Sequence, residues 1–257
     1  MKSFESIIQL MQPISLSEMN KVKLMNRIDT KYITDIETFS KLMELIQQKY
    51  YVQEHLGNRI AKYRTLYFDT PNLQFYMQHH NGKSARNKVR VRQYCDSGQF
   101  FCEIKKKSNK GRTVKKRIEV GSNDFIDLSY NPNIKTLIEK ELLIDCTELF
   151  PNLENRFFRI TFVNFEKTER LTVDFEVSFI NHQNHLENKL QNLVIIELKQ
   201  EGRSHSDFKQ MIYDLPVFEK SFSKYCIGVV VTDPSIKANR FKSKIHFLKN
   251  KLQTNFK

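Results

Sequence analysis

Several short segments of the chain alternate apolar and charged residues, which is typical of strands with one packed face and one polar face. Val89–Arg92 places two arginines on one face, and Glu103–Lys105 and Lys115–Glu119 repeat the alternation with charges of both signs. Arg170–Glu176 and Glu197–Lys199 repeat it further along the chain. These five segments predict a sheet with one face lined by arginine, lysine, aspartate and glutamate.

Periodicity and turn residues divide the rest of the chain into further elements. The turns Asp96–Gly98 and Asn109–Gly111 predict two consecutive hairpins. Helices are expected at about 1–11, 35–50, 72–80, 133–144, 206–215 and 234–252. Strands are expected at about 24–34, 63–69, 85–95, 99–108, 112–120, 156–165, 168–179, 193–201 and 224–231.

Many antiparallel strands with short turns predict an α+β fold, namely a closed antiparallel β-barrel with helices packed outside. No repeat or linker divides the chain, so we expect a single domain over 1–257, with a core of about 22–233 and a basic C-terminal helix at 234–252. A charged inner face persists only where it is solvated, paired or filled by a ligand. This requirement favours a tunnel.

The formal charge of the 257 residues is +13 at pH 7, which predicts an anionic partner. Charge alone does not choose among nucleic acid, phosphorylated small molecules, polyphosphate and anionic lipid. The four cysteines are scattered, and no run of apolar residues approaches the roughly 20 needed to cross a bilayer. Since no signal peptide is evident, a cytoplasmic protein is expected.

The alternating charges themselves indicate a chemistry. Arginine suits two-point contact with phosphate oxygens, and carboxylates hold Mg²⁺ or Mn²⁺. A charged outer sheet surface is the alternative for any one strand, but five such strands favour a site for polyphosphate and metal. The chain lacks the Gly-rich phosphate loops and the RNA-binding motifs of common nucleotide and RNA modules. Carboxylates among the arginines also argue against a nucleic acid partner.

Seven motifs follow one another along the chain, namely Asn26–Tyr32, Leu66–Pro71, Lys88–Arg92, Glu103–Lys105, Arg170–Asp174, Ile196–Lys199 and Phe222–Tyr225. In this order they resemble the VTC domain, the polyphosphate polymerase domain of the vacuolar transporter chaperone complex and its bacterial relatives. That domain belongs with the CYTH-like triphosphate tunnel metalloenzymes. The similarity covers about 26–240. Simpler triphosphatases of this superfamily begin with Glu-x-Glu-x-Lys, whereas only Asp29 is acidic at the matching positions here, which favours the VTC branch over a two-metal hydrolase.

The resemblance implies a tunnel whose lumen binds a triphosphate chain with a divalent metal, Mn²⁺ or Mg²⁺. By motif, the expected catalytic residues are Lys31, Arg90, Arg92, Lys105 and Lys224. Expected substrate-binding residues are Arg159, Arg170, Lys199 and Arg117, and the expected metal carboxylates are Glu197 and Glu103. We expect the strand residues among them to face the lumen.

The implied reaction is metal-dependent transfer of the ATP γ-phosphate onto polyphosphate. Two alternatives stay open, because binding and transfer use the same basic residues. One is hydrolysis of tripolyphosphate or of a nucleoside triphosphate, and the other is a polyphosphate-binding module without catalysis. The implied partners are ATP with polyphosphate or tripolyphosphate. The resemblance also allows a membrane subunit, which would hold the protein at the inner face of the membrane.

Overall fold

The computed structural model describes residues 4–21, 27–202 and 205–254. Its helices are α1 (Phe4–Leu10), α2 (Leu16–Lys21), α3 (Ile36–Ile46), α4 (Gln74–His80), α5 (Pro132–Leu142), α6 (Asp207–Met211), α7 (Lys224–Thr232) and α8 (Lys242–Lys251). Its strands are β1 (Pro13–Ser15), β2 (Arg27–Asp35), β3 (Tyr50–Glu54), β4 (Ala61–Asp69), β5 (Arg86–Tyr94), β6 (Gln99–Lys107), β7 (Thr113–Val120), β8 (Phe150–Asn164), β9 (Glu169–Asn181), β10 (Glu187–Leu190), β11 (Leu193–Glu201) and β12 (Phe218–Glu219).

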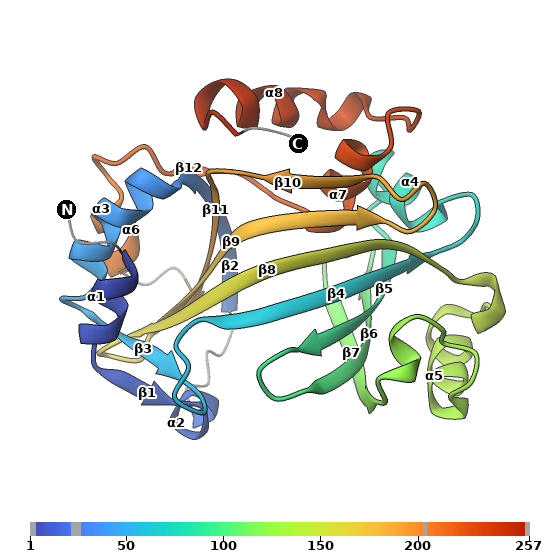
Figure 1. Cartoon of the computed structure of the whole chain (residues 1–257), viewed down its shortest axis with the longest axis horizontal. Coiled ribbons are helices and arrows are strands. Elements are labelled where there is room, and N and C mark those ends of the chain that lie inside the picture. Colours follow the sequence, from blue (N-terminus) through green and yellow to red (C-terminus); the bar gives the residue numbers. More distant parts are fainter. Residues whose placement is uncertain (1–3, 22–26, 203–204, 255–257) are drawn as a thin grey trace.

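The strands form one 12-stranded sheet, whose main path runs β12-β2-β11-β9-β8-β4-β5-β6-β7 (Figure 1). All pairs are antiparallel except β1 with β3. In the described part of the chain no pairing joins β7 to β12, so the expected closed barrel is not confirmed. The sheet is nevertheless curled. Strand β6 is far from β11 and β2 in the strand order, yet Lys105 on β6 is close enough to interact electrostatically with Glu197 on β11 and Lys31 on β2.

The convex face of the sheet is covered by helices, as expected. Near one end, α1, α3 and α6 pack on apolar residues of β2, β8, β9 and β11, and near the other end α5 packs on β4, β5 and β6 (Figure 1). These apolar positions alternate with the charged ones, as Tyr32 and Ile196 do with Lys31 and Glu197. Burial of one face therefore directs the charged side chains of the same strands to the concave face.

The predicted strand at 224–231 is wrong, because this segment is the helix α7. Ser223 caps its first turn by accepting a hydrogen bond from the backbone N–H of Cys226. The helix is buried almost all round, so its sequence is a continuous apolar run and shows no helical stripe. Such a run does not distinguish a buried helix from a buried strand.

Other predicted elements have the right type, but their ends differ from those in the structure. The C-terminal helix is Lys242–Lys251 and not 234–252, and β8 begins at Phe150, earlier than predicted. Strand β3 begins at Tyr50, where the prediction still had helix. The predictions for 1–3 and 24–26 lie outside the described residues. The short elements α2, β1, β10 and β12 carried no periodic signal.

Helix α7 lies on the concave face, which the sequence did not predict. Its Tyr225 and Val229 belong to an apolar cluster with Ile33 of β2 and Ile195 of β11. Since Ile33 and Ile195 are two residues from Lys31 and Glu197, they share the face of those charged side chains. The helix therefore fills one part of the concave face and leaves the charged part open.

Close packing of α7 against the sheet predicts a stability effect. A Cβ atom on Gly228 would lie 2.4 Å from Leu153 and 2.5 Å from Phe179. We expect Gly228→Val to lower the free energy of unfolding by about 1–3 kcal/mol, the usual cost of overpacking. Urea denaturation measures it. Gly121→Val is the matched control, because a Cβ there meets only Asp124, at 3.6 Å, and an equal loss in both variants would contradict the assignment.

Candidate functional site

The strand register brings the predicted site residues onto one face. Glu197 of β11 lies opposite Lys31 of β2 on one side and Thr172 of β9 on the other. Further along the strand order, on the same face, Arg90 of β5 lies opposite Glu103 of β6. The same register aligns three further rows on this face, namely Arg170 with Lys199 and Asp29, Glu103 with Arg117, and Lys88 with Lys105 and Lys115.

Three carboxylates on this face each hold two cations. Glu197 accepts from Lys31, with the Nζ–Oε1 distance at 2.5 Å, and from Lys199. Asp174 accepts from Arg159 at 2.6 and 2.7 Å and from Lys224. Glu103 accepts from Arg90, with the Nε–Oε2 distance at 2.7 Å, and forms an ion pair with Lys115. The arrangement is a set of buried ion-pair groups along the concave face.

Neighbouring cations determine the protonation state of these three carboxylates. Burial raises the pKa of Glu103, but Arg90 and Arg92 outweigh it and lower this pKa to about 2. The pKa of Asp174 is likewise held well below its usual range, because Arg159 and Lys224 outweigh burial. Lys199 and Lys31 do the same for the pKa of Glu197. All three groups are therefore ionised at neutral pH.

Other cations on the face have no carboxylate partner in the described residues. Arg92 is only 8% exposed and donates from Nε to the Thr65 hydroxyl at 3.3 Å. Arg170 has a buried Nε with no hydrogen-bond partner. Lys105 and Lys88 stand opposite each other, and burial and neighbouring cations lower the pKa of both. This excess of positive charge favours the binding of a polyanion.

Aromatic rings on the same face contact three of its cations, both paired and unpaired. The guanidinium carbons of Arg159 and Arg92 lie 5.2 and 5.4 Å from the centre of the Tyr63 ring. The Lys224 ammonium lies 4.3 Å from the centre of the Phe157 ring. Such cation–π contacts fix the direction of the side chain without neutralising its charge. Of these three cations, Arg159 and Lys224 are already paired with Asp174, whereas Arg92 has no carboxylate partner among the described residues and stays available to bind an anion.

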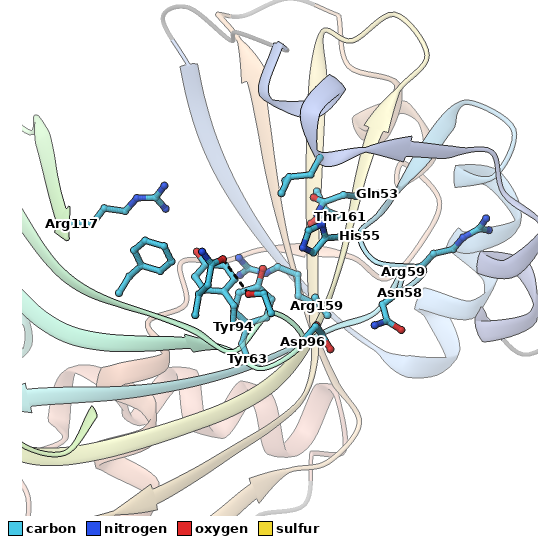
Figure 2. A pocket seen from close by; sticks show the side chains of 15 residues that line it. Gln53, His55, Asn58, Arg59, Tyr63, Tyr94, Asp96, Arg117, Arg159 and Thr161 are labelled. Carbon is cyan, nitrogen blue, oxygen red and sulfur yellow. Dashed lines mark hydrogen bonds between the residues drawn. The ribbon is translucent and has the colours of Figure 1, made fainter. Parts of the chain in front are cut away.

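A cavity of 310 Å³ opens beside this cluster (Figure 2). Among the predicted site residues, Arg159 and Arg117 line it, and Figure 2 shows Arg117 on the opposite wall from the β3–β4 turn that carries His55. Arg117 is exposed and lies against the Phe101 ring, with the guanidinium carbon 4.9 Å from the ring centre. The cavity connects solvent with the ion pair of Arg159.

Sequence reasoning missed some members of the cluster. Lys88 and Lys115 share the parity of Arg90 and Arg117 on their own strands, so alternation alone could have identified them. The ion pair of Asp174 with Lys224 joins β9 to α7, and no local pattern predicts it. Asp69 is not part of this cluster, because it accepts hydrogen bonds from the backbone N–H groups of Phe75 and Tyr76 in the first turn of α4.

The two predicted metal carboxylates do not form one metal centre. Glu103 and Glu197 belong to different ion-pair groups, and the described residues contain no cluster of three or more His, Cys, Asp or Glu. Glu197 alone still suits a hard cation, because it is ionised and half-buried. Opposite it, the Thr172 hydroxyl is buried without a hydrogen-bond partner. Phosphate oxygens would have to complete the coordination.

The chain belongs to the VTC domain family, whose model matches residues 26–232. A search of curated proteins found no match. Among solved structures, HpAC1 from Hippeastrum, an adenylyl cyclase candidate described with a dominant triphosphatase activity, has a TM-score of 0.54 at 13% identity, over 80% of this chain and 96% of that one. An adenylate cyclase candidate from Bacillus halodurans has a TM-score of 0.48 at 15% identity, over 77% and 96%.

The likeness to HpAC1 shows that the chain shares the fold of that protein, and at 13% identity it shows no more. In the described ranges, no helix is both long and apolar enough to cross a membrane. Family and fold together define a member of the VTC domain family with the fold of HpAC1.

The group of Arg159, Asp174 and Lys224 makes a testable prediction about stability. Asp174 is 3% exposed, so Asp174→Asn leaves two buried cations without their counter-charge. We expect a loss of about 3–5 kcal/mol in the free energy of unfolding. Urea denaturation measures the loss. Glu176→Gln on the same strand is the control, because Glu176 is exposed and its ion pair with Lys189, with an Nζ–Oε2 distance of 3.4 Å, lies at the surface. Equal stability of the two variants would contradict the assignment.

Proposed function

We propose that the protein transfers the γ-phosphate of ATP onto polyphosphate, with a divalent metal, inside a tunnel formed by the curled sheet. The observation that carries the proposal is the excess of cations on the concave face. Ion pairs occupy some of them, whereas Arg92, Lys105 and Arg170 have no carboxylate partner among the described residues. Membership of the VTC domain family supports the same reaction.

Phosphoryl transfer depends mainly on positioning and charge neutralisation, so the proposed roles are those of binding groups. Lys31, Arg90, Arg92, Lys105 and Lys224 would hold the phosphates that react. Arg159, Arg170, Lys199 and Arg117 would bind the rest of the chain. An incoming triphosphate would compete with Glu103, Asp174 and Glu197 for their cations, because it offers charged oxygens to the same groups.

Glu197 is the proposed carboxylate for Mn²⁺ or Mg²⁺, and phosphate oxygens would supply most of the remaining ligands. When bound, the metal neutralises phosphate charge. Lys31 and Lys199 would then be released to contact phosphate, since their carboxylate partner holds the cation. Glu103, enclosed by Arg90 and Lys115, would mainly orient Arg90.

Hydrolysis is the second candidate, and one observation favours it. HpAC1 shares the fold and is described with a dominant triphosphatase activity. Water can replace a phosphate acceptor in the same cationic site without any change in the groups that bind the triphosphate.

One experiment separates the candidates. The full chain is incubated with ATP and Mn²⁺, and the products are assayed by gel for long polyphosphate and by colour reaction for free phosphate. Polymer supports the proposed transfer, and free phosphate alone supports hydrolysis. Neither product, together with tight polyphosphate binding, indicates a binding module without catalysis.

The proposed roles predict different effects for arginine and glutamate variants. Arg90→Ala or Arg92→Ala should weaken tripolyphosphate binding roughly ten- to hundredfold, because each loses a charge-assisted contact worth about 1.5–3 kcal/mol. Glu197→Ala should abolish metal-dependent turnover and retain binding, since the site becomes more positive. Calorimetric titration with and without Mn²⁺ measures both. Arg92→Lys is the control, and it should recover binding only in part. Wild-type binding by both arginine variants would refute the site.

The pKa of Lys224 predicts a pH dependence. Burial and Arg159 lower this pKa to about 8, although Asp174 opposes them. Affinity for tripolyphosphate should therefore fall as the pH rises through about 8. The free energy of unfolding should not fall over the same pH range. In the unfolded chain Lys224 stays protonated up to about pH 10.4, so between about pH 8 and 10.4 the unfolded chain binds more protons than the folded chain. Titrations from pH 7 to 9.5 test this, with Lys224→Arg expected to flatten the profile. An unchanged slope in that variant would assign the dependence to another group.

A further inference from the structure

A second cavity, of 530 Å³, lies at the end of the sheet where β4 ends and β8 begins, beside the turn between β9 and β10 (Figure 1). It adjoins the last turn of α7, whereas Lys224 of the cationic site is in the first turn of that helix. A helix of 9 residues spans about 13 Å, so the two places are separate. None of the described residues that line this cavity is basic, although the chain has a formal charge of +13.

Two carboxylates line the cavity, and neither has a basic partner. Asp233 follows the last turn of α7 and is half-buried, and within the described ranges it forms no ion pair. Its Oδ1 accepts from the backbone N–H and the hydroxyl of Ser235, at 3.0 and 2.6 Å, which fixes the carboxylate and leaves Oδ2 for a ligand. Asp69 is saturated by three backbone N–H groups and the Tyr225 hydroxyl, so it contributes charge alone.

An orphaned acceptor in the wall is an independent sign of a ligand. Asn152 is only 4% exposed, and its Oδ1 is buried without a hydrogen-bond partner among the described residues. The neighbouring amides do not serve it. Gln183 donates to the Pro151 carbonyl at 2.7 Å, and Asn184 donates to the Thr232 carbonyl at 2.8 Å. Since a buried acceptor without a donor is destabilising, a ligand that supplies an N–H group is favoured here.

From these groups we infer that the cavity binds a small aliphatic amine, which is an ammonium group on a chain of methylene groups. An ammonium group has three N–H donors and no acceptor, so it matches both the Asn152 Oδ1 and the Asp233 Oδ2. The negative end of the α7 dipole favours a cation at the same place. This site is separate from the cationic face, and the inference does not rest on the proposed function.

The apolar part of the wall favours an organic cation over a metal ion. Pro71, Leu73 and the ring of Phe150 line the cavity, and they can contact the methylene groups of an amine. The volume of 530 Å³ lies within the usual range of small-molecule pockets, about 300–1,000 Å³, and far exceeds the roughly 30 Å³ of one water molecule. Phosphate is disfavoured, because the carboxylates repel it.

The test is calorimetric titration of the full chain, without phosphate ligands, with 1,5-diaminopentane and with 1,5-pentanediol. The diol has the same methylene chain but hydroxyls in place of the ammonium groups, and the wild-type protein should bind the diamine at least about tenfold more tightly. Asp233→Asn should lower the diamine affinity about ten- to hundredfold, because a charge-assisted contact is lost.

Asp127→Asn is the matched control for Asp233→Asn. The Asp127 Oδ1 likewise accepts from the backbone N–H and the hydroxyl of a serine two residues on, Ser129, at 2.8 and 2.7 Å. It does not line the cavity, so the diamine affinity of this variant should stay within about twofold of wild type.

Asn152→Leu tests the orphaned acceptor and separates a binding role from a structural one. The variant should lower the diamine affinity about two- to tenfold and should not lower the temperature of thermal unfolding, because an apolar group of similar size replaces an unpaired buried acceptor. A purely structural role of Asn152 would instead lower the unfolding temperature.

A loss of diamine affinity in both cavity variants, with tripolyphosphate affinity within about twofold of wild type, supports the amine site. The inference is overturned if the wild-type protein does not bind the diamine, if the diol binds equally well, or if Asp233→Asn binds the diamine like Asp127→Asn. Binding of CaCl₂ that excludes the diamine, or a parallel fall in tripolyphosphate affinity, would also overturn it. Tripolyphosphate is titrated separately on the wild-type protein, so failure of the amine site leaves the proposed function standing.

Discussion

The pairing of buried charges on the concave face is the constraint on which the rest of the structure depends. Glu103, Asp174 and Glu197 each hold two cations, and an isolated charge at these depths would cost several kcal/mol. Each of these ion-pair groups spans neighbouring strands or joins the sheet to α7. The groups therefore link neighbouring strands, and the sheet to α7, at the same time as they compensate charge. Cations beyond the reach of these carboxylates keep their charge for a ligand.

Helix α7 decides where on the concave face a ligand can lie. Its apolar residues cover Ile33 and Ile195, and at its first turn Lys224 reaches Asp174. Ser223 caps the same turn and accepts a hydrogen bond from Lys88 at 3.0 Å. One helix thus separates an apolar part of the face from a charged part and supplies a cation at the boundary. Neither part would be defined without it.

The chemistry changes in order along the open part of the face. Aromatic and neutral polar groups surround the cavity together with the charged residues Arg59, Asp96 and Arg117. Arg159 stands at its inner edge, and further lysines and arginines follow along the face. Arg159 belongs to both environments because it contacts the Tyr63 ring and the Asp174 carboxylate.

The sequence by itself determined the sheet-rich α+β class, the family and the concave side of most site residues. Alternation has a period of two, so the parity of Arg90, Lys105 and Glu197 already assigns them to one face. The identity of α7 was misread, because burial on all sides removes the periodicity that distinguishes a helix. Only tertiary structure decided which charges pair. Asp174 meets Lys224 across 50 residues and Lys31 meets Glu197 across 166, and no local pattern encodes such contacts. The aromatic cavity likewise combines β3, β4, β5 and β6, whose separate sequences give no sign that they share a wall.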